Sequence, residues 1–509
     1  MHNKTKLLIF ASLLLAACST DPMQEIPNRG DSAPEIETSG KICNTSDDAV
    51  AGSLIVKFGE EAIPSLEQNA LNAAKTRSAL TRSGIESVDD ILNDLHVTSL
   101  ERVFPEAGEH EARTRAAGLH RWYVLRFASE EDLDKAAERL AGVAEISKVQ
   151  FRTRLYRASD CKTYPFQATA NGQTRALVTA DFNDPNLFWQ WHYINNADQA
   201  VATTSVAGAD INVADAWKLT AGNPEVIVAI VDEGVKYTHP DLAANMWINK
   251  AEQSGTTGRD DDGNGYADDV YGYNFALGTS RLTWDVEAYD DKGKNVGDSG
   301  HGTHVAGTVA AVNNNGKGVC GVAGGTGSND GVKLMSCQIF SGNAVSNSLA
   351  TVRAIKYAAD NGAVILQCSW GYISGSANSY EWGAPGFKDE EEWATNAPLE
   401  KDALDYFLHN AGSPNGPIEG GLAIFAGGNE SAPQAGFPGA AEECISVSAT
   451  AADYTPAVYT NYGPGTTIAA PGGDQDYYYE YFDDNHKRGE IGCILSTLPY
   501  AISETGYGY

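Results

Sequence analysis

Cysteine and basic residues are both scarce in this chain of 509 residues. The eight cysteines are widely spaced and never form a Cys-x-x-Cys pair, which argues against a paired-cysteine zinc site, a dithiol redox motif or a small disulfide-framed scaffold. Lys and Arg number 36 against 67 Asp and Glu, so the formal net charge is −31. Because that charge repels nucleic acid and anionic membrane surfaces, we expect no nucleic-acid partner.

The first apolar run is too short to span a bilayer comfortably. Residues 7–17 follow Lys4 and Lys6, which is typical of a secretory signal. The run ends in LAAC, which resembles a bacterial lipobox, so residues 1–18 are interpreted as a lipoprotein signal peptide and Cys18 as the lipidated residue. The alternative is an ordinary secretory signal in which Cys18 is incidental. Both interpretations predict export, and the first predicts a cell-envelope lipoprotein held at the membrane by its lipid anchor alone.

Three segments precede the large C-terminal region. Residues 19–47 are rich in Pro, Ser, Asp and Glu without an apolar period, which is typical of a tether. Residues 48–156 predict a small α+β ferredoxin-like domain with a β-α-β-β-α-β order. Its strands are expected at 53–58, 97–104, 122–127 and 146–151, and its helices at 63–79 and, from a capping-box pattern, at 129–140. Residues 157–182 lack periodicity and are expected to be an exposed connector open to proteolysis.

Residues 183–509 predict an α/β domain. Continuous apolar runs, as buried parallel strands need, occur at 226–231, 332–338, 363–369, 422–426 and 445–449. Helical periodicity lies between several of them, at 304–312 and 348–361. This alternation predicts a doubly wound, mostly parallel sheet.

Two motifs in this region carry chemistry. In VAIVDEG (residues 228–234), Asp232 ends an apolar strand, so its carboxylate is expected at the carboxyl edge of the sheet, where it can orient an imidazole. In GHGTHVAGT (residues 300–308), His301 opens a helix whose small residues allow another backbone to approach closely. The alternatives are a helix-capping Asp and a buried structural His. A zinc pair of His301 and His304 is disfavoured, because the familiar helical pair is four residues apart and no third ligand is marked.

In this order, the motifs resemble the subtilisin-like serine proteases, or subtilases. The resemblance implies that Asp232 is the catalytic Asp and that His301 is the general base. It implies a peptide-binding strand at Ser369, Trp370 and Gly371, and a cleft wall with an oxyanion-hole amide at Gly427, Gly428 and Asn429. The alternative for Asn429 is a turn residue after two glycines.

The resemblance also implies a domain plan and an activity. Residues 183–509 become a serine-type endopeptidase domain acting on polypeptides, and residues 48–156 an inhibitor-like prodomain that acts as an intramolecular inhibitor. Cleavage in the connector would separate the lipid anchor from the peptidase domain. The alternative for residues 48–156 is an independent binding domain. Residues 371–420 look like a long insertion beside the cleft, which either shapes substrate choice or is a solvated surface loop.

One part of the family pattern is missing. The nucleophilic serine is expected in a Gly-Thr-Ser-x-Ala motif after Asn429, and the sequence has none there. Residues 492–498 and 506–509 resemble the approach to it, but Ser496 and Ser503 lack the motif, and the GTS at 278–280 precedes His301. We therefore expect the chain to be incomplete at its C-terminus and inactive as given, for lack of an activated nucleophile. The alternative is a non-catalytic exported surface binding protein that keeps the fold.

Calcium is the expected structural cofactor. The loop DDDGNGYAD (residues 260–268) spaces oxygen ligands as in an EF-hand, but Tyr271 replaces the final Glu, so another carboxylate must join. The side-chain ligands would be Asp260, Asp262, Asn264 and Asp268. The alternative is a solvated acidic turn. By resemblance, Asp241 and Asn314 match the family's structural calcium site, although the loop after Asn315 carries an apparent extra residue.

Overall fold

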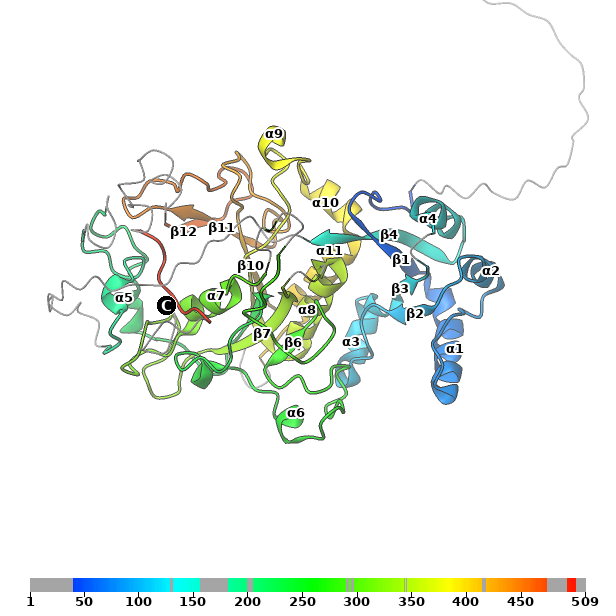
Figure 1. The fold of residues 1–509 in the computed structure, drawn as a ribbon, viewed down its shortest axis with the longest axis horizontal. Coiled ribbons are helices and arrows are strands. Elements are labelled where there is room, and N and C mark those ends of the chain that lie inside the picture. Colours follow the sequence, from blue (N-terminus) through cyan, green and yellow to red (C-terminus); the bar gives the residue numbers. More distant parts are fainter. Residues whose placement is uncertain are drawn as a thin grey trace, which may run out of the picture.

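The structure, a computed structural model, describes residues 40–128, 131–155, 182–198, 205–289, 293, 297–342, 344, 346–413, 418–473 and 492–499. An N-terminal domain (residues 40–155) and a larger α/β domain (from residue 182 onward) lie side by side in Figure 1. The predicted signal peptide with Cys18, and most of the predicted tether and connector, lie outside the described residues. Within the part of the chain that is described, no helix has the length and apolarity needed to cross a membrane.

The N-terminal domain is an antiparallel sheet with three of its helices packed on one face. Its strands are β1 (Ala49–Phe58), β2 (Ser99–Arg102), β3 (Trp122–Arg126) and β4 (Ile146–Leu155), and its helices are α1 (Ile63–Thr76), α2 (Glu86–Asp94), α3 (Glu111–Ala116) and α4 (Leu133–Ala141). The strand order β2-β3-β1-β4 is antiparallel throughout, as expected of a ferredoxin-like domain. Along β1, Leu54 and Val56 pack with α1, α2 and α4, whereas Ile55 belongs to the core shared with the α/β domain.

Two predicted helix limits in this domain are wrong. The side chain of Asp132 accepts a hydrogen bond from Lys135 N, so Asp132 is the N-cap and α4 begins at Leu133 rather than at Ser129. Helix α1 stops at Thr76, because Arg77 adopts a left-handed conformation (φ 54°). Helices α2 and α3 were not predicted. Short 3-10 helices lie at Glu60–Ala62, Gly108–His110, Leu119–Arg121, Leu187–Trp189 and Ala243–Asn245.

The α/β domain is built on a seven-stranded sheet of order β12-β11-β10-β9-β5-β7-β6, in which every pairing is parallel. The strands are β5 (Ile227–Glu233), β6 (Gly272–Asn274), β7 (Lys333–Phe340), β9 (Ala363–Cys368), β10 (Leu422–Ala426), β11 (Ile445–Thr450) and β12 (Ile468–Pro471). The helices are α5 (Val213–Trp217), α6 (Lys250–Ser254), α7 (His301–Ala310), α8 (Ser348–Asp360), α9 (Ser379–Trp382), α10 (Glu390–Asn396) and α11 (Pro398–Asn410).

Both faces of this sheet are covered, which confirms the predicted doubly wound fold. Along β5, Val228 and Ile230 pack in one apolar cluster with α7, while Ala229 and Val231 pack in another with α8 and α11. Because side chains alternate along a strand, helices must cover both faces to bury them. The carboxyl ends of β5, β9 and β10 therefore share one open edge.

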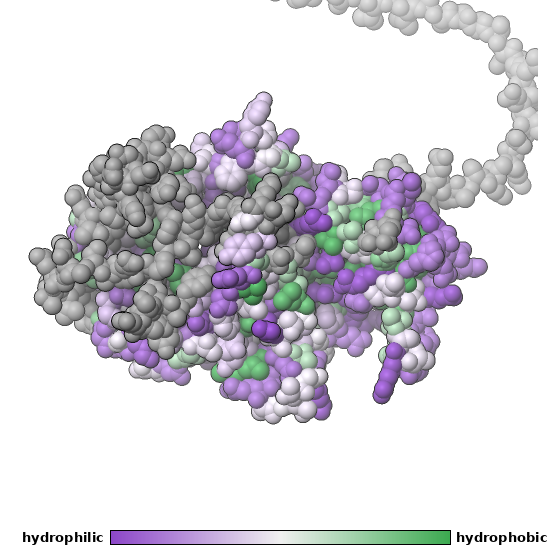
Figure 2. Space-filling view, in the orientation of Figure 1, coloured by the Kyte–Doolittle hydropathy of each residue, from purple (hydrophilic) through white to green (hydrophobic). Residues whose placement is uncertain are grey.

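The two domains are joined by a continuation of the N-terminal sheet. Arg154 and Leu155, at the end of β4, pair antiparallel with β8 (Ser346–Asn347) of the α/β domain. The apolar residues Ile55, Trp122 and Val124 lie in one buried cluster with α8 and α11. In the view of Figure 2, hydrophilic residues cover much of the visible surface of the N-terminal domain. The domain therefore presents its apolar sheet face to the α/β domain and a polar surface to solvent.

Candidate active site

Asp232 and His301 meet at the carboxyl edge of the parallel sheet. Asp232 lies near the end of β5 and is 2% exposed, while His301 is the first residue of α7. His301 Nδ1 lies 2.8 Å from Asp232 Oδ1 and 2.9 Å from Oδ2. A carboxylate at that ring atom holds the imidazole in one tautomer and stabilises its protonated form. The Nε2 edge of the ring is directed away from the carboxylate, and 26% of the His301 side chain is exposed.

Two glycines allow other segments to contact α7 directly. A Cβ atom at Gly302 would lie 2.1 Å from Glu233 O, and one at Gly307 would lie 2.3 Å from Thr497 Oγ1. Neither position accepts a side chain without displacement of a neighbour. The helix that carries His301 is thus packed tightly against the end of β5 and against residues 492–499.

Residues 492–499 cross α7 and bond to its backbone. Ser496 Oγ donates to His304 O at 2.7 Å, and Thr497 Oγ1 donates to Thr303 O at 2.8 Å. His304 Nε2 bonds Ile494 O at 3.0 Å, and burial lowers the pKa of His304 to about 4. His304 is therefore a neutral structural residue, and the buried hydroxyl of Ser496 serves the packing of this segment. Ser503 and residues 506–509 lie outside the described residues.

Asn429 lies three residues beyond the end of β10, at the same edge as Asp232. Its loop is held by Asn461, which sequence reasoning missed because TNYG in residues 460–463 looks like an ordinary turn. Asn461 is fully buried; its Nδ2 donates to Gly427 O at 3.0 Å, and its Oδ1 accepts from the backbone N–H groups of Glu430 and Ala432. Gly428 has φ 110°, a conformation that favours glycine, so the loop shape depends on it as well.

The predicted substrate wall follows β9 and β10, which pair through Cys368 and Phe425. Residues 369–371 and residues 427–428 therefore lie on neighbouring strand ends. Trp370 is 4% exposed and its Nε1 donates to Val231 O at 2.9 Å, so its side chain belongs to the core. The predicted pairing of this segment with a peptide would therefore use main-chain groups rather than the Trp370 side chain.

The insertion after this wall is a packed structure over much of its length. Trp393 on α10 is 1% exposed, stacks on Phe437 with ring centroids 5.9 Å apart, and donates from Nε1 to Glu400 Oε2 at 2.9 Å. Burial raises the pKa of Glu400 to about 7. Phe437 also accepts the Tyr372 N–H through its carbonyl oxygen at 2.7 Å. The interpretation as a solvated loop is therefore wrong around Trp393, which supports the wall from behind.

Comparison with known proteins decides the family. The model of the subtilase family matches residues 223–500, more than half of the chain. The chain belongs to the subtilase family. It is 29% identical over 305 residues to halolysin of Haloferax mediterranei, covering 60% of this chain and 43% of halolysin. It is 24% identical over 315 residues to the thermophilic serine proteinase of Bacillus sp. strain AK1, covering 61% of each chain.

The structural comparison agrees on the fold of this subtilase. Fervidolysin from Fervidobacterium pennivorans, described as a keratinolytic enzyme related to subtilisin, superimposes with a TM-score of 0.50 at 18% identity. The match covers 94% of this chain and 52% of fervidolysin. The chain thus spans less than two thirds of the length of these relatives.

The acidic loop of this subtilase groups carboxylates differently from the prediction. One ligand atom from each of Glu252, Asp262 and Asp269 lies within 4.8 Å of the others, while Asn264 Nδ2 donates to Asp269 Oδ2 at 3.0 Å. Burial, followed by the effect of neighbouring acids, raises the pKa of Asp269 to about 7. Glu252 supplies the additional carboxylate that the sequence required, and an all-oxygen group of this kind suits a hard divalent cation.

Two of the predicted ligands do not join this group. Asp260 accepts the backbone N–H groups of residues 263–265, so it shapes the loop itself. Asp268 has φ 59° and accepts the N–H of Gly258 with both oxygens, and the neighbouring Asp269 takes its place. The positive φ of Asp268 turns the backbone at this point. A prediction from EF-hand spacing counts residues along the chain and does not include such a turn.

The structure does not bring Asp241 and Asn314 together as a cation site. Asp241 is fully buried and accepts Asn315 Nδ2 at 2.7 Å and Val319 N at 3.0 Å, one on each oxygen. The Asn314 amide instead donates to Thr326 O at 3.1 Å. The amide of Asn315 therefore occupies the position beside Asp241, and burial raises the pKa of Asp241 to about 7.

Proposed function

We propose that this protein is a serine-type endopeptidase that hydrolyses peptide bonds in polypeptides. The observation that carries the proposal is the Asp232–His301 pair, with His301 Nδ1 2.8 and 2.9 Å from the two carboxylate oxygens. The carboxylate orients the imidazole, and the Nε2 edge takes the proton of the nucleophile and returns it to the leaving amine. Asn429 donates its amide to the oxyanion of the tetrahedral intermediate, while residues 369–371 pair with the peptide main chain.

The proposed mechanism also needs a serine whose hydroxyl the Nε2 edge of His301 can deprotonate. The chain has no Gly-Thr-Ser-x-Ala motif after Asn429, and the given residues are accordingly expected to be inactive alone. The test is hydrolysis of an unfolded protein by the product of the complete gene, compared with its His301→Ala variant. Equal activity in the two proteins would overturn the proposed mechanism, and a gene that stops at Tyr509 would favour the non-catalytic binding protein.

The N-terminal domain is proposed to be an intramolecular inhibitor of the peptidase domain. Support comes from β4, whose end adds to β8 close to the edge that carries Asp232. Cleavage in residues 157–182 would leave this contact non-covalent, so that the N-terminal domain could dissociate from the peptidase domain. It would also free the peptidase domain from the lipid that Cys18 is proposed to carry at the bacterial cell envelope after export.

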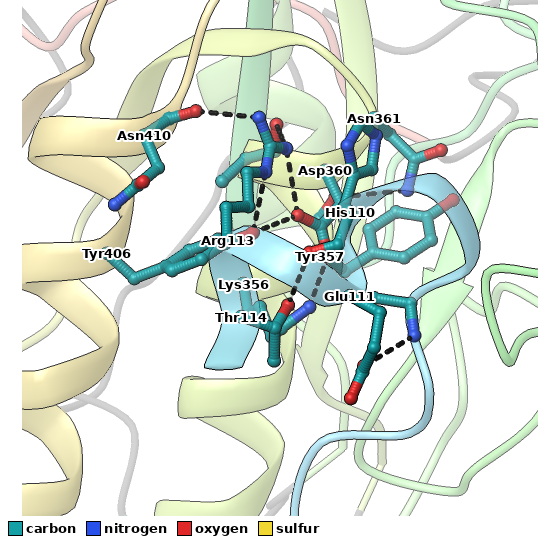
Figure 3. Close-up of polar contacts among 12 residues, drawn as sticks. His110, Glu111, Arg113, Thr114, Lys356, Tyr357, Asp360, Asn361, Tyr406 and Asn410 are labelled. Atoms are coloured by element: carbon teal, nitrogen blue, oxygen red, sulfur yellow. Dashed lines mark hydrogen bonds and ion pairs between the residues drawn. The ribbon is translucent and has the colours of Figure 1, made fainter. Parts of the chain in front are cut away.

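Arg113 on α3 makes the densest polar contact between the two domains (Figure 3). Its Nε donates to Tyr406 Oη at 2.8 Å, its Nη1 to Asn410 O at 2.9 Å, and its Nη2 to Asp360 Oδ1 at 2.9 Å. Lys356 also pairs with Asp360. Burial opposes the charge of Arg113, but the hydrogen bond to Asp360 and the nearby negative groups raise its pKa overall.

Arg113→Ala is expected to weaken the contact between the cleaved N-terminal domain and the peptidase domain by about 30-fold or more. The side chains of Arg113 and Asp360 are 29% and 9% exposed, so the pair is partly buried. Loss of one partner is expected to cost about 2 kcal/mol, the low end for a hydrogen-bonded charge pair. The measurement is the Kd of the two fragments after cleavage in the connector. Arg139→Ala is the matched control, because Arg139 pairs with Asp94 on the surface of the same domain. An unchanged Kd for Arg113→Ala would contradict the prediction.

Calcium is proposed as the structural cofactor, held by Glu252, Asp262 and Asp269, while Asn264 donates a hydrogen bond to Asp269. Saturating Ca²⁺ at a hundredfold excess over its Kd is expected to stabilise the full-length protein by about 2.7 kcal/mol, a gain lost with a chelator. Glu252→Gln should remove most of this gain, whereas Asp241→Asn should keep it. The measurement is Tm with and without Ca²⁺. A calcium gain that Asp241→Asn abolishes and Glu252→Gln preserves would reverse the assignment.

A further inference from the structure

Glu233 occupies an unusual position between the strand and the helix of the active site. It is the last residue of β5, directly after Asp232, and is 1% exposed. Its two carboxylate oxygens accept the backbone N–H groups of Ser299 at 3.0 and 3.1 Å, Gly300 at 2.9 Å and His301 at 3.1 Å. Ser299 Oγ also donates to it at 3.2 Å. One buried carboxylate therefore satisfies three consecutive backbone donors that lead into α7.

Helix α7 has no capping side chain of its own. Its N-cap is Gly300 in a left-handed conformation (φ 83°), which offers no side-chain oxygen. The first N–H groups of a helix need acceptors, particularly when they are buried. Glu233 supplies these acceptors from a different element, and Gly302 lets the helix pack onto the Glu233 carbonyl oxygen. The start of α7 is thereby fixed in both distance and direction relative to β5.

Asp232 and Glu233 then hold the same residue at two points. Successive side chains of a strand point to opposite sides, so the two carboxylates diverge. Asp232 contacts the imidazole of His301, and Glu233 contacts its backbone N–H. We propose that Glu233 is a positioning residue for His301, which sets the imidazole in register with Asp232 and adds a second negative charge beside it.

This inference rests on the proposed peptidase function and adds an electrostatic consequence. Opposite charge favours the protonated imidazole, whereas the positive end of a helix disfavours it. Among the described residues, the titratable groups near His301 include Asp232 and Glu233 from β5 and His304 from its own helix, with Lys236 and Asp298 on the adjoining loops. Asp232 and Glu233 both accept hydrogen bonds from His301. Loss of the Glu233 charge is therefore expected to lower the pKa of His301.

The test compares Glu233→Gln, Glu233→Asp and Glu225→Gln in the full-length protein. Glu225 is exposed near the start of β5, so its variant controls for loss of a carboxylate at the other edge of the sheet. For Glu233→Gln we expect kcat to fall by about 100-fold with little change in KM, as for a misplacement of about 1 Å. The acid limb of the kcat/KM profile should move about one pH unit lower. Glu233→Asp, which keeps the charge, should restore the position of that limb.

Hydrogen exchange separates this inference from the proposed function. The amides of residues 299–301 should exchange at least about tenfold faster in Glu233→Gln than in wild type and in Glu225→Gln, whether or not the protein hydrolyses peptides. If the wild-type protein were inactive but residues 299–301 still exchanged faster in Glu233→Gln alone, the proposed function would be overturned, whereas the capping contact would be supported. Wild-type exchange, or wild-type kcat and pH profile, in Glu233→Gln would overturn the inference.

Discussion

His301→Ala is expected to lower kcat for peptide hydrolysis by about 10⁴- to 10⁶-fold in the full-length protein, the range for loss of one member of a catalytic triad. The imidazole is the only base that Asp232 orients at this edge of the described structure, and alanine offers no group to take the proton of the nucleophile. KM is expected to change little, because the proposed binding sites for the substrate are residues 369–371 and the cleft wall at residues 427–428, which His301→Ala leaves in place.

The measurement is kcat and KM on a fluorogenic peptide, with Tm as the check on folding. His409→Ala is the matched control, because His409 is exposed on α11 and bonds only within its own helix and to Glu443 in the described contacts. Asp232→Asn is expected to cost about 10⁴-fold through the wrong imidazole tautomer. If both His301→Ala and His409→Ala had a kcat within tenfold of the wild-type value, His301 would not be the base, and another residue would have to accept the proton.

The central strands of the parallel sheet were predictable because they are buried on both faces. The continuous apolar run at residues 226–231 identifies such a strand without reference to its partners, and β5 (Ile227–Glu233) is buried along its whole length. The edge strand β12 is half-exposed, has only four residues and ends in a proline, and β6 has only three residues, so neither was predicted as a strand. Asp232 was predictable for the same reason, since a strand end places its carboxylate at the ligand edge before any partner is known.

Residues whose role depends on a contact between distant segments were not predictable. Glu233 accepts the N–H of Ser299, 66 residues later in the chain and just before α7, and nothing in the neighbouring sequence of Glu233 indicates that contact. Glu252 joins the acidic loop from the helix before it, and Asn461 reaches back to Gly427. From the sequence alone Arg113 is indistinguishable from a surface arginine of a short helix, because its partners lie in the other domain. In each case the sequence supplies the residue type, while the fold supplies the partner.

Asn429→Ala is expected to lower kcat by about 100- to 1000-fold and to leave KM nearly unchanged. The amide is proposed to bind the oxyanion, which exists only in the tetrahedral intermediate and the transition states that flank it, so its loss removes no ground-state interaction. In subtilisin, a member of the same family, removal of one oxyanion-hole donor costs about 3 to 4 kcal/mol. The measurement is again kcat and KM on a fluorogenic peptide, and a raised KM with unchanged kcat would contradict the assignment.

A second variant separates catalysis by Asn429 from the shape of its loop. Asn461→Ala removes the buried amide that bonds to Gly427, Glu430 and Ala432, and each group left unsatisfied costs about 1 to 3 kcal/mol of stability. It is therefore expected to lower Tm by several degrees as well as kcat. Asn429→Ala should lower kcat alone, because Asn429 is half-buried at the cleft and Asn461 keeps the loop in place. Equal losses of Tm in the two variants would make Asn429 a structural residue rather than the oxyanion donor.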